Sequence, residues 1–197
     1  MTFQTRVFEL VDPEWAREIA AIRRFADSIR PPKNTKTGTI SVAACAYLMA
    51  VTSLIQPRIV IEIGTFIGTS ILSMRASKHL YTCDKDNDCF SSQPGITAYG
   101  RTRSTVMLTD LLSQGVKADF MFFDGRAQDV DLPLIQQLSL PTTVYGFDDF
   151  EGNEKGVWNV RRFIPLLPGY ALIPPPKKVP WFKGVTTIAL LVPKGLA

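Results

Sequence analysis

Apolar residues recur with a helical period in the first part of the chain. Between positions 14 and 28 they fall at Trp15, Ile19, Ile22 and Phe25 with charged residues opposite them, which indicates an amphipathic helix. The segment Arg30-Pro31-Pro32 ends this helix, and a polar loop follows over 33–39. A second helix is expected from Ser41, a suitable N-cap, to about Ile55, and it is apolar on most faces.

After Pro57 the pattern changes to short apolar runs that alternate with helical segments. Strands are predicted at 58–63, 80–83, 96–99, 120–123 and 143–147, and helices at about 70–78, 105–113, 132–138 and 156–164. Such alternation is typical of a parallel sheet covered by helices on both faces. We therefore predict a Rossmann-like, doubly wound α/β fold in one domain, with N-terminal helices in 1–56 and an α/β core in 57–197.

Two further strands are predicted near the C-terminus, at 170–174 and 186–192, with a proline-rich connection between them and no helix. Strands joined without a crossover helix pair in antiparallel fashion. The predicted seven-stranded sheet is therefore parallel except for its last strand, which runs in the reverse direction near one edge.

Composition and charge narrow the class of protein. The 197 residues are 46% apolar and 20% charged, as in ordinary globular domains. The net charge is +4, but no run of Lys and Arg exceeds two residues, so the clustered cations of a nucleic-acid-binding surface are absent. No segment reads as a secretory signal or a membrane span. Three cysteines without a CxxC motif fit a reducing compartment, so we expect a cytoplasmic protein.

A glycine turn follows the first predicted strand in the segment IVIEIGTFIGTS at 59–70. Gly64 permits a sharp turn and close approach of a ligand to the backbone, and a helix is expected to start near Ser70. Two glycines four residues apart do not make the dinucleotide fingerprint, which requires three. A glycine-rich turn of this kind also occurs for packing alone.

Acidic residues end three of the predicted strands. Asp84 follows the second strand, where a carboxylate can accept hydrogen bonds from ribose hydroxyls; an exposed turn carboxylate is the alternative. Asp124 ends the strand at 120–123, and Asp148 and Asp149 end the next one. Because ligands bind at the carboxyl edge of such sheets, these three acids are candidates to bind one Mg²⁺ through oxygen ligands.

With these motifs in place, the chain resembles the class I S-adenosylmethionine-dependent methyltransferases from about residue 36 onward. It is most similar to their small O-methyltransferase branch of the catechol and caffeoyl-coenzyme-A type. The likeness rests on EIGTFIGTS at 62–70, YTCDKD at 81–86, FFDG at 122–125, GFDDF at 146–150 and the terminal strand pair.

The resemblance implies S-adenosylmethionine as cofactor and assigns roles to individual residues. The motif residues Glu62 and Gly68 would belong to the cofactor site, with Gly64 and Phe66 along the methionine part and Ser70 near its carboxylate. Asp84 would hold the ribose, and Gly100, Thr102 and Arg103 would border the adenine. Asp124 would lie near the sulfonium methyl group.

The resemblance also implies a metal, but the chain departs from the pattern at two positions. Metal-dependent relatives carry an Asn where this chain has Asp149, and a lysine base where it has Ala127. Arg126 remains protonated and can only orient an oxyanion. Metal-assisted O-methylation therefore stands beside transfer with Asp124 or Asp149 as base, or by alignment alone.

The acceptor is expected to be a small molecule. The segment 175–184, PPKKVPWFKG, would overhang the site and offer Trp181 and Phe182 as an acceptor wall; a plain surface hairpin is the alternative. The N-terminal helices are expected to close the pocket or to form a homodimer surface. Rival functions are a non-catalytic nucleoside-binding protein, an NAD(P)-dependent oxidoreductase and an RNA-modifying methyltransferase.

Overall fold

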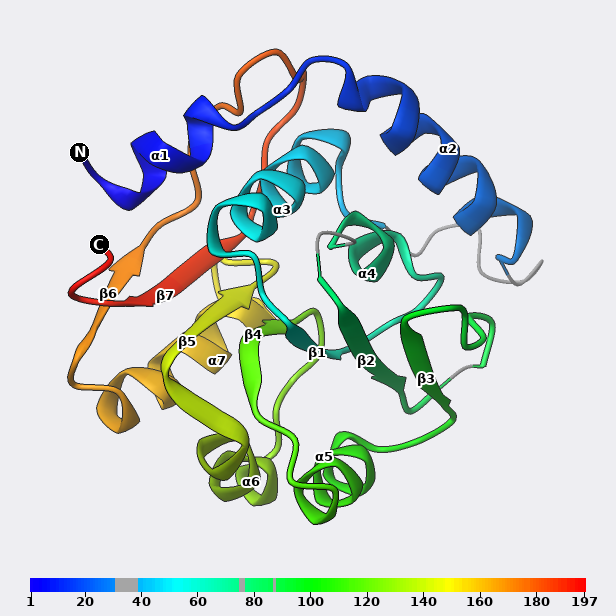
Figure 1. The fold of residues 1–197 in the computed structure, drawn as a ribbon, viewed down its shortest axis with the longest axis vertical. Helices are drawn as coiled ribbons and strands as arrows, with labels where there is room; N and C mark the ends of the chain where they lie inside the picture. The colour runs from blue at the N-terminus through cyan, green and yellow to red at the C-terminus, as the bar shows by residue number, and fades with distance from the viewer. Residues whose placement is uncertain (31–38, 75–76, 87) are drawn as a thin grey trace.

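The computed structural model describes residues 1–30, 39–74, 77–86 and 88–197, and its centre is a seven-stranded sheet (Figure 1). The strand order is β3-β2-β1-β4-β5-β7-β6. The strands are β1 (Ile59–Ile63), β2 (His79–Asp84), β3 (Ile96–Gly100), β4 (Ala118–Phe123), β5 (Ser139–Phe147), β6 (Tyr170–Ile173) and β7 (Ala189–Pro193). The predicted α/β class and all seven predicted strands are confirmed.

Only β7 is reversed. It lies between β5 and β6 and pairs antiparallel with both, whereas the pairs from β3 through β5 are all parallel. The chain moves from β6 to β7 without a helix, so the return strand can only run in the opposite direction. The predicted reversed strand near the edge is therefore confirmed.

Helices cover both faces of the sheet, as the continuous apolar strands require. Alternate strand residues divide between two cores: Val60 and Phe122 pack in one, and Ile61 and Phe123 in the other. The first core also holds α1 (Phe3–Glu9), α2 (Trp15–Ser28), α3 (Val42–Ile55) and α4 (Thr69–Ser73). The second holds α5 (Ser104–Ser113), α6 (Leu132–Leu138) and α7 (Lys155–Phe163), on the opposite side of the sheet in Figure 1. Two short 3-10 turns, η1 (Asp129–Asp131) and η2 (Ile164–Leu166), precede α6 and follow α7.

The N-terminal helices form an additional layer. Helix α3 lies against the sheet with its residues 43–52 buried, and α1 and α2 lie outside it (Figure 1). The hydroxyl of Ser41 accepts a hydrogen bond from the Ala44 amide at 3.0 Å, so the predicted N-cap is confirmed. The apolar faces of α1 and α2 pack inward through residues such as Val7 and Ile22.

Two helices differ from the sequence-based prediction, and one predicted loop lies mostly outside the described residues. Helix α1, capped by Thr2, was not predicted. Helix α4 ends at Ser73, well short of the expected end near 78. Most of the predicted polar loop at 33–39 lies outside the described residues. Among the described residues, no helix is long and apolar enough to cross a membrane.

Candidate functional site

A cleft of about 840 Å³ opens at the carboxyl edge of the sheet. Its walls come from the ends of β1, β2 and β4, the start of α5 and the segment after β4. Strand order reverses between β1 and β4, which is where open α/β sheets bind ligands. Of the predicted site residues, Gly64, Asp84, Thr102, Arg103 and Asp124 line this cleft.

The glycine turn brings the tips of β1 and β4 together. Gly64 has φ +101°, and a Cβ there would lie 2.7 Å from the carbonyl carbon of Asp124. The Asp124 amide also donates to the Ile63 carbonyl at 2.9 Å. Close approach of the neighbouring backbone therefore requires glycine at position 64, in addition to any approach by a ligand.

The remaining turn residues support the cleft from behind. Phe66 has φ +46°, and its amide donates to Oδ2 of Asp84 at 2.9 Å. The guanidinium carbon of Arg30 lies over the Phe66 ring, 5.5 Å from the ring centroid. A Cβ at Gly68 would lie 2.2 Å from the ring of the buried Phe90. Phe66, Gly68 and Ser70 are not among the residues that line the cleft.

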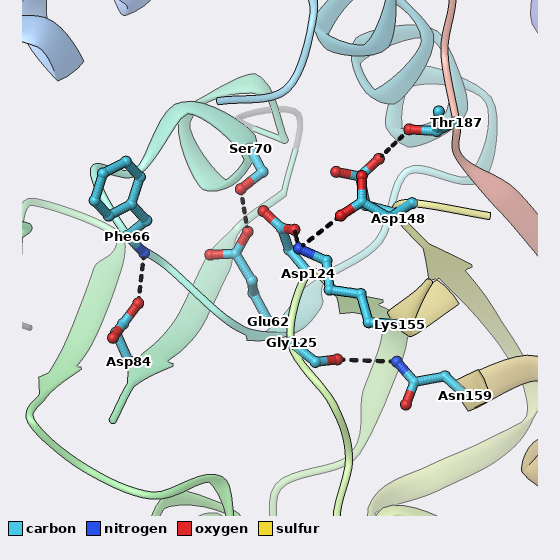
Figure 2. A network of polar contacts seen from close by, with 11 residues as sticks. Glu62, Phe66, Ser70, Asp84, Asp124, Gly125, Asp148, Lys155, Asn159 and Thr187 are labelled. Atoms are coloured by element: carbon cyan, nitrogen blue, oxygen red, sulfur yellow. Dashed lines mark hydrogen bonds and ion pairs between the residues drawn. The ribbon is translucent and has the colours of Figure 1, made fainter. Parts of the chain in front are cut away.

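Glu62 and Ser70 form a buried polar cluster with Thr82. The hydroxyl of Ser70 donates to Oε1 of Glu62 (Figure 2). The hydroxyl of Thr82 donates to Oε2 at 2.5 Å. Burial raises the pKa of Glu62 to about 8, although both hydroxyl donors act in the opposite direction. The predicted cofactor residues Glu62 and Ser70 thus bind each other beneath the turn.

Asp84 and the start of α5 form the wall at the β2 end. The Asp86 amide donates to Oδ1 of Asp84 at 2.9 Å, and the Thr102 amide donates to the Asp84 carbonyl at 2.9 Å. Arg103 is the N-cap residue of α5. The neighbouring Cys83 also lines the cleft, but burial raises the pKa of its thiol to about 12, so the thiol stays protonated at neutral pH.

A buried carboxylate that the sequence analysis missed joins this wall to the segment after β4. Asp131 is fully buried and accepts hydrogen bonds from the hydroxyls of Ser104 and Thr105 at 2.7 and 2.6 Å. The Gln128 amide donates to the same carboxylate at 2.7 Å. One side chain therefore fixes two walls of the cleft.

The three acids predicted as metal ligands do converge. Ligand oxygens of Asp124, Asp148 and Asp149 all lie within 4.8 Å of one another. However, the ammonium of Lys155 lies among them, 2.5 Å from Oδ1 of Asp124 and 3.0 Å from Oδ2 of Asp149. Figure 2 shows this side chain extending toward Asp124. The hydroxyl of Thr187 donates to Oδ1 of Asp148 at 2.8 Å.

Burial and mutual charge shift the pKa values of this group. Burial and the charge of Asp148 raise the pKa of Asp124 to about 7, against the opposing charge of Lys155. Burial alone would lower the pKa of Lys155, but the charges and hydrogen bonds of Asp124 and Asp149 together outweigh it and raise the pKa. Lys155 is therefore an ammonium at neutral pH.

Helix α7 holds Lys155 in position. A Cβ at Gly156 would lie 2.1 Å from the Asp148 carbonyl oxygen, so the first turn of α7 packs directly on the tip of β5. One turn later, the buried Asn159 donates to the Gly125 carbonyl at 2.9 Å and accepts from the Ala127 amide at 3.1 Å. The sequence analysis missed Lys155 and Asn159. The signal available for Lys155 was a cation at a predicted helix start, six residues after an acidic strand tip.

The proposed acceptor segment 175–184 is anchored next to α3. The hydroxyl of Ser41 donates to the Val185 carbonyl at 2.6 Å, and Phe182 packs against the core. The Trp181 side chain is 77% exposed, and neither aromatic residue lines the cleft. The segment leads into Thr187, which binds Asp148.

Searches with the sequence found no matching family model and no matching curated protein. Solved structures do match. An O-methyltransferase from Bacillus cereus in complex with SAH has a TM-score of 0.62 at 17% identity, over 88% of this chain and 90% of that chain. The O-methyltransferase TomG from Streptomyces achromogenes, in complex with SAM, has a TM-score of 0.62 at 21% identity, over 88% and 89%. The chain shares the fold of these O-methyltransferases.

A third solved structure also matches. A Staphylococcus aureus protein described as a candidate caffeoyl-CoA O-methyltransferase has a TM-score of 0.62 at 12% identity, over 89% of this chain and 91% of that chain. At these identities the likeness establishes the fold, and the activity is argued from the site.

Proposed function

We propose that this protein is an S-adenosylmethionine-dependent methyltransferase that methylates an oxygen of a small-molecule acceptor. The observation that supports this most is the position of the cleft: Asp84 and Asp124 line it from two strand tips on either side of the switch point. The structural neighbours in complex with SAH and SAM have the same fold.

The shape and polarity of the cleft fit this cofactor. A volume of about 840 Å³ is within the range of small-molecule sites. We assign the ribose to Asp84, the adenine to the cleft wall at Thr102 and Arg103, and the methionine end to Gly64 and Asp124; Gly100 does not line the cleft. Glu62, Phe66, Gly68 and Ser70 then support the turn. Bound there, S-adenosylmethionine supplies an electrophilic methyl group; the acceptor hydroxyl gains the methyl and loses its proton, and the sulfonium becomes a thioether.

Mg²⁺ does not fit the acid cluster while Lys155 is in place. The carboxylate oxygens suit this ion, but the ammonium already binds two of the three predicted ligands, Asp124 and Asp149. We therefore assign Asp124 and Asp149 a catalytic role as the groups that hold Lys155 beside the reacting atoms.

The acceptor would bind on the Asp148 side of Asp124, below the 175–184 segment. This assignment is supported by the contact between Thr187 and Asp148, which connects that segment to the acid cluster. Trp181 would provide a flat apolar surface for an aromatic acceptor. In this arrangement the N-terminal helices cover α3, and a homodimer would use their outer surfaces.

Calorimetric titration with S-adenosylmethionine and S-adenosylhomocysteine tests the proposal, with NAD as the control ligand. We expect both sulfur nucleosides to bind and NAD not to bind. Loss of a charged hydrogen bond in Asp84→Ala should weaken binding about 10- to 100-fold. Asp88→Ala is the matched control, because Asp88 lies in the same turn but pairs with Arg101 outside the cleft. No binding of either sulfur nucleoside to the wild type would refute the proposed function.

A further inference from the structure

We propose that the Lys155 ammonium permanently takes the place of a divalent cation at the acid cluster and binds a single oxygen of the acceptor. The second half of this proposal rests on the proposed function; the first half does not. The starting point is that Nζ of Lys155 contacts carboxylates from two different strand tips, Asp124 after β4 and Asp149 after β5. A bridging metal ion would have to make these same two contacts.

The lysine is held rigidly enough to compete with a metal. Its side chain is 26% exposed, so the ion pairs are partly shielded from water and are stronger than surface pairs. Its backbone is fixed by the contact of Gly156 with the Asp148 carbonyl and by the two hydrogen bonds of Asn159. A dication would therefore have to displace an ammonium whose backbone is anchored at the first turn of α7.

The third carboxylate is also engaged. Oδ1 of Asp148 accepts a hydrogen bond from Thr187, which orients this acid toward the segment that leads into β7. Mg²⁺ requires near-octahedral oxygen geometry at short distances and loses its waters reluctantly. To bind here it would have to break both ion pairs of Lys155 and leave the ammonium partly buried without a partner, which is costly.

The geometry of an ammonium also limits the acceptor. An ammonium has three N–H donors, and Asp124 and Asp149 use two of them. One donor remains, and it can bind one oxygen, whereas an octahedral metal ion can bind two oxygens of a vicinal diol. We therefore infer an acceptor with one acidic hydroxyl, such as a monophenol. Its proton passes to water as the oxyanion forms, and Lys155 keeps all its protons.

The exclusion of a divalent cation by Lys155 is tested with Mn²⁺ alone, without cofactor or turnover. Mn²⁺ is added to the protein, and the electron paramagnetic resonance signal of the ion that stays free is measured. Wild-type protein should leave the free Mn²⁺ signal unchanged at millimolar metal. Lys155→Met frees Asp124 and Asp149 to bind metal beside Asp148 and should reduce the free Mn²⁺ signal, and the double variant with Asp124→Ala should restore it. Lys155→Arg is the charge-retaining control and should behave as wild type does. Thermal unfolding confirms that each variant is folded.

Either of two results would overturn the first half. One is loss of the free Mn²⁺ signal with the wild type at millimolar metal, because the lysine would then yield to the metal; this measurement needs no variant to fold. The other is a folded Lys155→Met that binds no metal, because the cluster would then have no cation site for Lys155 to occupy.

Turnover tests the second half. A series of monophenols and vicinal diphenols, assayed with and without EDTA, should show methylation of monophenols that EDTA does not reduce. Activity restricted to diphenols, or abolished by EDTA, would refute the single-oxygen site. Failure of S-adenosylhomocysteine to bind would instead refute the proposed function and leave the Mn²⁺ result standing.

Discussion

Replacing Glu62 with Gln should change how stability depends on pH. Glu62 is completely buried at the end of β1, where its carboxyl binds the hydroxyls of Ser70 and Thr82. Burial raises its pKa to about 8 from the 4.5 of a free glutamate. The folded protein therefore keeps a proton at this carboxyl over a pH range in which the unfolded chain has lost it. Stability falls as pH rises through that range, because the native state binds more protons.

The size of the effect follows from the two pKa values. A difference of one bound proton changes the free energy of unfolding by about 1.4 kcal/mol per pH unit. Between about pH 5 and pH 8 the wild type should lose roughly 3 kcal/mol through this group alone. A glutamine side chain stays neutral throughout, and the neighbouring hydroxyls can rotate to pair with its amide. Glu62→Gln should match the wild type near pH 5 and exceed it near pH 8.

Urea unfolding at a series of pH values measures this, with the wild-type value subtracted from the variant value so that other titrating groups cancel. Glu9→Gln, at an exposed site on α1, is the matched control for removal of a carboxylate and should give a difference that hardly varies with pH. If the Glu62→Gln difference is equally flat across the series, Glu62 is ionised in the folded protein and the reasoning fails.

Three further substitutions test the packing and the acceptor segment. Gly64→Ala should cost about 3 kcal/mol in urea unfolding, because its Cβ would meet the backbone of Asp124 at positive φ. The control Gly115→Ala, with φ +70° and open space around it, should cost about 1 kcal/mol. Equal costs for the two substitutions would contradict the close approach at Gly64. Asn159→Leu should cost about 2–4 kcal/mol by unpairing the buried Ala127 amide and the part-buried Gly125 carbonyl. A neutral result would argue against this anchor. Trp181→Ala should raise the KM for an aromatic acceptor and leave S-adenosylhomocysteine affinity unchanged; an unchanged KM would place the acceptor elsewhere.

The sheet could be predicted because its central strands, such as β1 and β4, are buried on both faces. A strand such as β4, apolar from Phe120 to Phe123 with an acid at its end, is recognisable without knowing its neighbours. The predicted helix extended past Ser73 because the sequence up to Lys78 keeps a helical pattern, whereas α4 ends at Ser73. Helix α1 was missed because seven residues give a weak periodic signal, although Thr2 is a typical N-cap.

The acids of the candidate site were predictable for a related reason. The carboxyl ends of parallel strands meet at one edge, so Asp124 and Asp148 had to lie near each other once both strands were assigned. The position of Lys155 could not be predicted in this way. It reaches Asp124, 31 residues away in sequence, only because α7 packs on the β5 tip at Gly156. That contact depends on the absence of a side chain, which periodicity does not reveal.

The glycine turn after β1 connects the packing of the strand ends to the position of the charged cluster. From the sequence, room for a ligand and room for packing were alternative explanations of Gly64. In the structure the missing Cβ admits the backbone of Asp124, and the resulting contact brings the β1 tip beside the β4 tip, where both line the cleft. A side chain at position 64 would separate these tips and shift Asp124 relative to Lys155. Packing at this glycine is therefore the means by which the cleft and the charged cluster are held together, so the two explanations describe one requirement.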